Sequence, residues 1–380
     1  MNRDVFISIV CNILMFVNIS CIPSKEVEIL IDQIVIDLNS LVEQPIDSLV
    51  ADFKFTPLET NDSVVIQDIR KLLIENEYLY ILERHSQEIL VFSVTSGKLI
   101  SKVSKSGFGP GEYGRIGDFQ VGEGGTVEIL DDMHNKLLKY SGQGDFLSER
   151  KVPFMATSFC YLGSDILFSR PIVPAEKEWM YQLIRTSQEL NVVGKYLEIG
   201  KSSDLVFSPK IPLQNNNSNV NFMPVYDSHI YEVSQTGIRK KYFLNFDDKW
   251  PEEKILYAKY AQPFDLISAL QKSGDVYFLN YLEGEIHLVL FYEQEGEARL
   301  IIYNKESKKS TLIKDFESTI CFSEEYLDYH DGYFVSVKQP YAIYDLYDQG
   351  KIHKNAEVSK LMNSINKLDN PVIMFTKFKN

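Results

Sequence analysis

The stretch EYLYILERHSQEILVFSVTSGKLISKV, from Glu77 to Val103, contains three short apolar runs separated by a polar turn and a glycine turn. The stretch GTVEILDDMHNKLLKYSGQGDFLSERKV, from Gly125 to Val152, repeats this order. Ile81 aligns with Ile129 and Ile89 with Leu137, in both cases 48 positions further along the chain. Repeats of about 40–50 residues that each contain several strands are typical of a β-propeller.

Weaker copies of the same pattern occur later in the chain, in residues 228–246, 274–292 and 331–347. Residues 51–72 supply further strand material before the clear repeats. If residues 155–245 hold two divergent units, the chain contains about six units. The predicted fold is therefore all-β, a single β-propeller of six four-stranded blades with short helical insertions. We expect the first and last strands of the ring to pair in one blade, because this pairing removes an exposed sheet edge.

Other segments of the chain give local predictions. PEEKILYAKYAQ (251–262) and NAEVSKLMNSINKL (355–368) are predicted helices, since the first begins with proline and acids and the second places apolar residues on one face. NPVIMFTKFK (370–379) is a predicted last strand. The alternating tyrosines of YAIYDLYD (341–348) indicate a strand with one packed face. LQNNNSNVN (213–221) is predicted to be a polar loop.

The N-terminus is predicted to be a targeting segment. Arg3 precedes a largely apolar run from Val5 to Val17, which is too short for an ordinary spanning helix. Cys21 follows Ser20, and this arrangement is similar to the cleavage site of a bacterial lipoprotein, in which Cys21 would carry the lipid. Ordinary secretion or a membrane-retained signal is the alternative. The predicted divisions are a signal peptide at 1–20, a tether and first strand at 21–50, and the propeller at 51–380.

Composition limits the partners and cofactors. Lys and Arg number 39 against 53 Asp and Glu, a net charge of -14, which argues against a nucleic-acid partner. The cysteines show no metal-binding spacing, so we expect no metal and no cofactor. Cys160 and Cys321 could pair in an exported protein, but both lie in apolar strand-like runs, which favours two buried free thiols.

SGFGPGEYGRIGDF, from Ser106 to Phe119, could be a phosphate-binding loop or a turn that the fold itself requires. A phosphate loop leads into a helix, whereas this loop leads into a strand-like run and carries Glu112, which would repel phosphate. Gly107, Gly109 and Gly111 are therefore assigned to the sharp connection between two blades, at positions that need positive φ, with Pro110 stiffening the turn.

Candidate site residues lie in and near this loop. Glu112, Tyr113 and Arg115 could line a ligand site at the channel mouth, although locking the turn against a neighbouring blade is the favoured role for Glu112 and Tyr113. Asp131 is predicted to accept hydrogen bonds from turn amides. A site assembled from several blades could also include His287, His330, Glu283 and Glu285.

The loop and the repeat that follows it resemble NHL-type propeller repeats, and more closely the six-bladed β-propeller lipoproteins of Bacteroidetes. The shared motifs are the GFGPGEY turn, the ILD…K…Y…G.F blade and the N-terminal cysteine, together with Asp369-Asn370-Pro371 before the last strand and PLET at 57–60. This resemblance implies a six-bladed propeller in the bacterial envelope, and it carries fold and location rather than activity.

Three functions are compatible with the sequence. The leading hypothesis is a binding or scaffolding lipoprotein, held to the membrane by its N-terminal lipid on the periplasmic face or the cell surface. Its channel mouth would take a peptide, a glycan or a partner protein. The alternative is a propeller enzyme, a hydrolase or lyase acting on a sugar or lactone at an axial site. The third is a purely structural envelope component.

Overall fold

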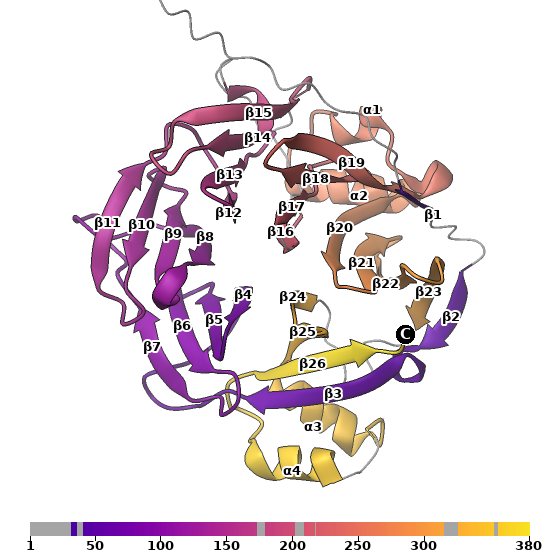
Figure 1. The fold of residues 1–380 in the computed structure, drawn as a ribbon. Coiled ribbons are helices and arrows are strands. Elements are labelled where there is room, and N and C mark those ends of the chain that lie inside the picture. Colours follow the sequence, from indigo (N-terminus) through magenta and orange to yellow (C-terminus); the bar gives the residue numbers. More distant parts are fainter. Residues whose placement is uncertain are drawn as a thin grey trace, which may run out of the picture.

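The computed structural model describes residues 32–35, 41–172, 179–201, 209–216, 218–314, 326–352 and 356–380. Six small sheets surround a central axis, as Figure 1 shows. Each sheet is one blade, and four antiparallel strands run from the axis to the rim. The predicted all-β, six-bladed propeller is confirmed, including the two divergent blades expected within residues 155–245.

Blades 1 to 3 each consist of four consecutive strands. From the axis outward, blade 1 contains β4 (Ile69–Glu75), β5 (Tyr78–Glu83), β6 (Glu88–Ser93) and β7 (Leu99–Val103). Blade 2 contains β8 (Ile116–Val121), β9 (Val127–Asp131), β10 (Lys136–Tyr140) and β11 (Phe146–Lys151). Blade 3 contains β12 (Ser158–Leu162), β13 (Asp165–Ser169), β14 (Tyr181–Thr186) and β15 (Val192–Glu198).

Blades 4 to 6 also take up the N-terminal strands. Blade 4 contains β16 (Leu213–Asn216), β17 (Asn219–Phe222), β18 (His229–Ser234) and β19 (Gly237–Asn245), with β1 (Asp32–Val35) added in parallel to β19. Blade 5 contains β20 (Val276–Glu283), β21 (His287–Gln294), β22 (Glu297–Asn304) and β23 (Lys309–Lys314), with β2 (Val42–Pro45) in parallel to β23. Blade 6 contains β24 (Tyr326–His330), β25 (Tyr333–Lys338), β26 (Val372–Phe378) and β3 (Val50–Pro57).

The helices are insertions between strands. α1 (Glu253–Leu256) and α2 (Pro263–Ser273) join β19 to β20, while α3 (Pro340–Asp348) and α4 (Ala356–Ser364) join β25 to β26. Among the described residues, short 3-10 turns are η1 (Ile46–Ser48), η2 (Glu123–Gly125) and η4 (Asp247–Lys249). Within the part of the chain that the structure describes, no helix combines the length and apolar character needed to cross a bilayer.

The two best-matched repeats occupy equivalent positions in blades 1 and 2. Ile81 lies on β5 and its counterpart Ile129 on β9, each the second strand of its blade. Gly97 and Gly144, in the turns between third and fourth strands, both have positive φ, at 65° and 87°. Glycine adopts this conformation without a Cβ clash, which explains why both repeats carry it there.

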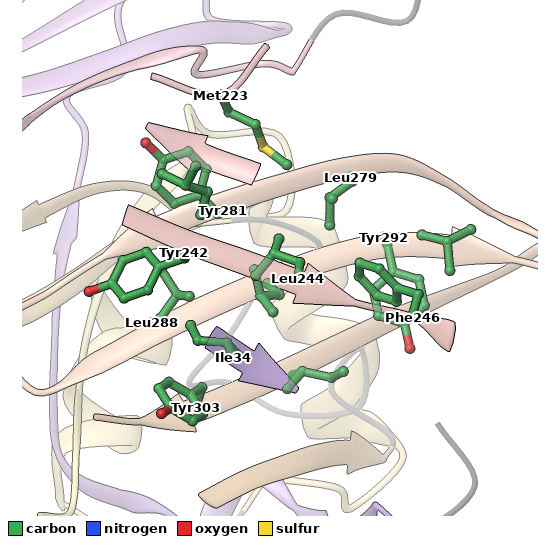
Figure 2. Close-up of a cluster of buried hydrophobic side chains, with 14 of the residues drawn as sticks. Ile34, Met223, Tyr242, Leu244, Phe246, Leu279, Tyr281, Leu288, Tyr292 and Tyr303 are labelled. Atoms are coloured by element: carbon green, nitrogen blue, oxygen red, sulfur yellow. The ribbon is translucent and has the colours of Figure 1, made fainter. Parts of the chain in front are cut away.

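Apolar side chains fill the space between neighbouring blades. Among the described residues, six buried clusters each join two adjacent blades around the ring. Figure 2 shows the cluster between blades 4 and 5, where Leu244 of β19 and Phe246, just after this strand, meet Leu288 and Tyr292 of β21. Ile34 of β1 lies in the same cluster with only 1% of its surface exposed. The N-terminal strand is therefore anchored to the rim by core packing as well as by backbone pairing.

The ring closes in blade 6, where the N-terminal strand β3 pairs antiparallel with the C-terminal strand β26. The Asp369-Asn370-Pro371 and PLET motifs of the sequence analysis meet at this closure. The buried Asn370 side chain accepts a hydrogen bond from the Ile66 amide at 2.8 Å and donates to the carbonyl oxygens of Glu59 and Val64 at 2.7 and 3.0 Å. Its own amide donates to the Thr60 hydroxyl at 2.7 Å. The expected pairing of terminal strands is confirmed.

Two helix predictions and the last strand are confirmed in type, with altered bounds. The predicted helix at 251–262 is helical only in α1, and the longer α2 follows it. α2 begins there because Pro263 occupies the first turn and Gln262 and Asp265 cap each other's backbone amides. The helix predicted at 355–368 is α4, and the last strand is β26.

Two local predictions are wrong. YAIYDLYD is helix α3 rather than a strand, because Pro340 starts a helix that buries Ile343 and Leu346, three residues apart, on one face. LQNNNSNVN is not a loop, since β16 and β17 form a hairpin within it. Its polar residues led to the prediction of a loop. They occur in a strand because β16 borders the central cavity, where an inner strand can expose amide side chains.

We predict that Asn370→Ala destabilises the ring by about 2 kcal/mol, because it leaves buried backbone groups of the connection without partners. Asn363→Ala on the exposed surface of α4 is the matched control and should change stability by less than about 0.5 kcal/mol. Denaturant unfolding of both variants measures the difference. Equal stabilities for the two variants would contradict the role of Asn370.

Candidate functional site

The two faces of the ring differ in construction. The first strand of every blade runs in the same direction, so the blade-to-blade connections and all four helices lie on one face, which we call the connection face. The turns that follow each first and third strand form the opposite face, which we call the turn face. The GFGPGEY loop joins β7 to β8 and belongs to the connection face.

The loop is built around a type II turn. The Glu112 amide donates to the Gly109 carbonyl at 3.1 Å, Pro110 is the second residue of the turn, and Gly111 is the third, with a φ of 73°. This turn type requires positive φ at its third position and favours proline at its second. A Cβ atom on Gly111 would also come within 2.7 Å of the Phe146 ring.

Gly107 and Gly109 are needed for space rather than for positive φ, which corrects the reason expected from the sequence. The Glu112 carboxylate folds back over the loop and accepts a hydrogen bond from the Gly109 amide at 2.8 Å. A Cβ atom would lie 2.0 Å from Glu112 Oε2 at Gly107 and 3.0 Å from it at Gly109. The Glu112 side chain is therefore committed to holding the loop.

Tyr113 is fully buried between blades 1 and 2. Its hydroxyl donates to the Gln87 carbonyl at 2.8 Å and accepts from the Lys105 amide at 3.1 Å, and burial raises its pKa to about 12. Arg115 is exposed and its Nε lies 2.7 Å from Asp132 Oδ1. The Tyr113 contacts fasten the loop to blade 1, which is the role favoured for Tyr113 in the sequence analysis. The Glu112 side chain instead binds within its own loop.

Asp131 accepts hydrogen bonds from the amides of Gly114, Met133 and His134, and His134 Nδ1 lies 2.7 Å from it. Burial opposes its ionisation, but these hydrogen bonds hold the pKa of Asp131 below its ordinary value. Glu83 occupies the equivalent position in blade 1, 48 residues earlier, and accepts from the amides of Gln67, Asp68 and Ser86. A buried carboxylate thus joins the second strand to the incoming connection in both blades.

The first strands of the blades surround an axial cavity of about 540 Å³. Every blade contributes to its wall from its first strand or the turn after it. The lining residues are Lys71, Leu73, Ile74, Glu75, Gln120, Val121, Cys160, Ile211, Leu213, Gln214, Asn215, Asn216, Leu282, Glu283, Gly284, Glu285, Lys305, Leu327, Asp328 and Tyr329. Glu112, Tyr113 and Arg115 do not belong to this set.

Side chains on the inner strands bind the next blade around the ring. Lys71 of blade 1 reaches Asp118 of blade 2 at 2.6 Å, and Asp118 accepts from the Phe159 amide of blade 3 at 2.9 Å. The Cys160 thiol of blade 3 contacts Asn215 Oδ1 of blade 4 at 2.8 Å. These contacts commit several polar groups of the wall to the fold.

Glu283 is the centre of the most heavily bonded part of the wall. It accepts hydrogen bonds from Tyr242, Asn221 and Lys305 at 2.8, 2.6 and 3.0 Å, and Lys241 lies at 3.0 Å. Burial would raise its pKa, but the two lysines outweigh burial and lower it. Glu283 was a possible site residue in the sequence, and its bonds commit it to joining blades 4 and 5.

Three other carboxylates of the wall have no cationic partner among the described residues. Glu75 and Glu285 lie in the turns at the turn face, with exposed side chains. Asp328 accepts hydrogen bonds from the amides of Ile74 and Tyr329 at 2.8 and 2.9 Å. Burial raises the pKa of Asp328 to about 7, against the opposing effects of these hydrogen bonds and of Lys71. The cavity therefore has free acceptors at its turn-face end.

The histidines considered for an axial site do not line the cavity. His287 is buried, with its ring against Phe378 and its Nε2 3.2 Å from Asn304, and His330 lies 3.5 Å from Asp331. The described part of the chain holds no group of three or more His, Cys, Asp or Glu that could bind a metal ion. Burial raises the pKa of Cys160 to about 12, which leaves its thiol unreactive. Cys21 and Cys321 lie outside the described residues.

Comparison with known proteins adds the family. The model of a family described as "Domain of unknown function (DUF4934)" matches residues 33–377. No curated protein matches the chain. The fold is similar to that of a "Putative exported protein" of Bacteroides fragilis, with a TM-score of 0.80 and 20% identity over 91% of this chain and 99% of that one. A member of the DUF4221 family from Bacteroides vulgatus matches with a TM-score of 0.53 and 12% identity over 87% and 97%.

We predict that Gly107→Ala destabilises the protein by more than about 1 kcal/mol, because its methyl group displaces the Glu112 carboxylate. In a Glu112→Ala background the same change should cost less than about 0.5 kcal/mol. Gly200→Ala, whose Cβ would meet no atom within 4 Å, is the control. Denaturant unfolding of the wild type, the two single variants and the double variant gives the coupling energy between positions 107 and 112. Additive changes in stability would contradict the steric role of Glu112.

Proposed function

The chain belongs to the DUF4934 family, and we propose that it is an exported, lipid-anchored propeller whose axial cavity binds a polar ligand of the cell envelope. The ligand would be an envelope peptide, a glycan or an exposed segment of a partner protein. The observation that carries the proposal is the cavity itself. About 540 Å³ lies within the size range of sites for small ligands, and all six blades line it, five of them with amide, carboxyl or ammonium groups.

Unsatisfied polar groups support binding over a purely structural role. In the lining set, Glu285 and Asn216 have no side-chain hydrogen bond to another described residue, and only the carbonyl oxygen of the Asn215 amide is engaged. A ligand that pairs these groups gains specificity, because polar groups left unpaired on a closed site cost binding energy. The enzymatic alternative has Asp328 as its support, since a carboxyl group with a pKa of about 7 can act as a general acid or base.

Export and anchoring are supported by the residues at the N-terminus and by the similarity to the exported protein of Bacteroides fragilis. Cys21 precedes the first residue of β1, Asp32, by 11 positions. β1 runs parallel to the outermost strand of blade 4, so the chain enters this strand from the turn face. A lipid on Cys21 would therefore tether the propeller close to the rim of blade 4.

We expect Asn216→Trp to abolish ligand binding, because the indole ring would fill the mouth of the cavity. The probe is the purified full chain in detergent, applied to arrays of envelope glycans and short peptides. Gln143→Trp, at an exposed turn of blade 2, is the control and should bind as the wild type does. Array signals that are equal for the wild type and Asn216→Trp would contradict a cavity site.

Cys21→Ala should abolish lipid attachment and release the protein from the membrane fraction. Metabolic labelling with an alkyne fatty acid, followed by fractionation, measures both effects. Cys160→Ala is the control, since this buried thiol should have no part in anchoring. Retention of label in Cys21→Ala would contradict the lipid anchor while leaving the cavity proposal untouched.

A further inference from the structure

We propose that the axial cavity selects ligands that carry an ammonium or guanidinium group, and that Glu75, Glu285 and Asp328 receive this group. The proposal rests on the proposed function and specifies its ligand class. The basis is the distribution of charge over the wall, where the cations are neutralised and one group of carboxylates is not.

Both lysines of the wall are already paired. Lys71 Nζ binds Asp118 at 2.6 Å and the Phe119 carbonyl at 2.8 Å. Lys305 Nζ binds Glu283 and the Gly284 carbonyl, at 3.0 and 2.7 Å. An anionic ligand would have to compete with these carboxylates for lysines that cannot move toward it without losing two hydrogen bonds each.

The carboxylates that have no ion pair with a described residue come from three consecutive blades. Glu285 follows β20 of blade 5, Asp328 lies on β24 of blade 6, and Glu75 ends β4 of blade 1. β24 contacts both β20 and β4, so these residues form one sector of the wall with Asp328 at its centre. Glu75 lies close enough to Asp328 to raise its pKa, which places the two carboxylates within electrostatic reach of each other.

The side of the wall that blades 2 to 4 form is uncharged. Gln120, Cys160, Asn215 and Asn216 come from blades 2 to 4, on the other side of the axis. Amide side chains both donate and accept hydrogen bonds, so they suit the uncharged remainder of a ligand. Tyr329 also contributes to the lining, with its ring packed on Phe334. The wall thus presents one anionic side and one amide side.

A bound cation should change the protonation of Asp328. The charges that act on it are Lys71 and Glu75 on β4. The neighbouring wall of blade 5 contributes Glu283, Glu285 and Lys305, and Tyr329 follows Asp328 on β24. Burial raises the pKa of Asp328 to about 7, so part of the population is protonated at neutral pH. A cation favours the ionised form, so binding releases protons and affinity rises as pH increases through this pKa.

The probes are the Nα-acetylated forms of argininamide and citrullinamide, because acetylation removes the α-ammonium group and leaves a guanidinium in one probe against a neutral urea group in the other. We expect isothermal titration of the full chain at pH 8 to show argininamide binding at least about tenfold more tightly. Glu285→Gln should remove at least about fivefold of the argininamide affinity and leave citrullinamide unchanged. Glu306→Gln, an exposed carboxylate in the next turn of blade 5, is the control and should change neither affinity.

The pH series separates this mechanism from general surface attraction. Argininamide affinity should rise between pH 6 and 8, and Asp328→Asn should remove this rise. Equal affinities for the two probes, or a Glu285→Gln variant that binds argininamide as the wild type does, would overturn the inference. If neither probe binds while a neutral or anionic array ligand is lost in Asn216→Trp, the inference fails and the proposed function stands.

Discussion

Each blade of this propeller has two apolar faces, and neither can be buried unless the ring closes. The six interblade clusters bury leucine, isoleucine, phenylalanine and tyrosine side chains, each worth about 1.5–3 kcal/mol on transfer from water. A gap at any interface would expose two such faces together. The pairing of β3 with β26 and the hydrogen bonds of Asn370 therefore support every other contact in the ring.

The N-terminal segment extends this closure around the rim. β1 and β2 add fifth strands to blades 4 and 5 before β3 completes blade 6. Each added strand covers a sheet edge that would otherwise present unpaired amide and carbonyl groups to solvent. Because Ile34 is buried between blades 4 and 5, the segment is part of the folded domain from β1 onward.

The inner strands meet a different requirement, since one side of each borders the axial cavity. Polar side chains there either bind the next blade, as Lys71, Asp118 and Glu283 do, or face the cavity without a protein partner, as Glu285 does. The first group stabilises the ring and the second can bind a ligand. This division within one wall explains why a single structure can be rigid and still leave polar groups free for recognition.

The sequence by itself determined the repeat, because the second and third strands of blades 1 and 2 face apolar neighbours and form clear apolar runs. It also located the type II turn at Pro110 and Gly111, where local backbone geometry dictates residue type. Only the tertiary structure decided the cavity wall, whose members lie up to 258 positions apart, from Lys71 to Tyr329. Polar inner strands such as β16 lack the apolar pattern that marks the other strands. Tyr113 was a site candidate in the sequence, but it is a core residue because blade 1 packs over it. Burial and partnership depend on segments distant in the chain, so local patterns cannot reveal them.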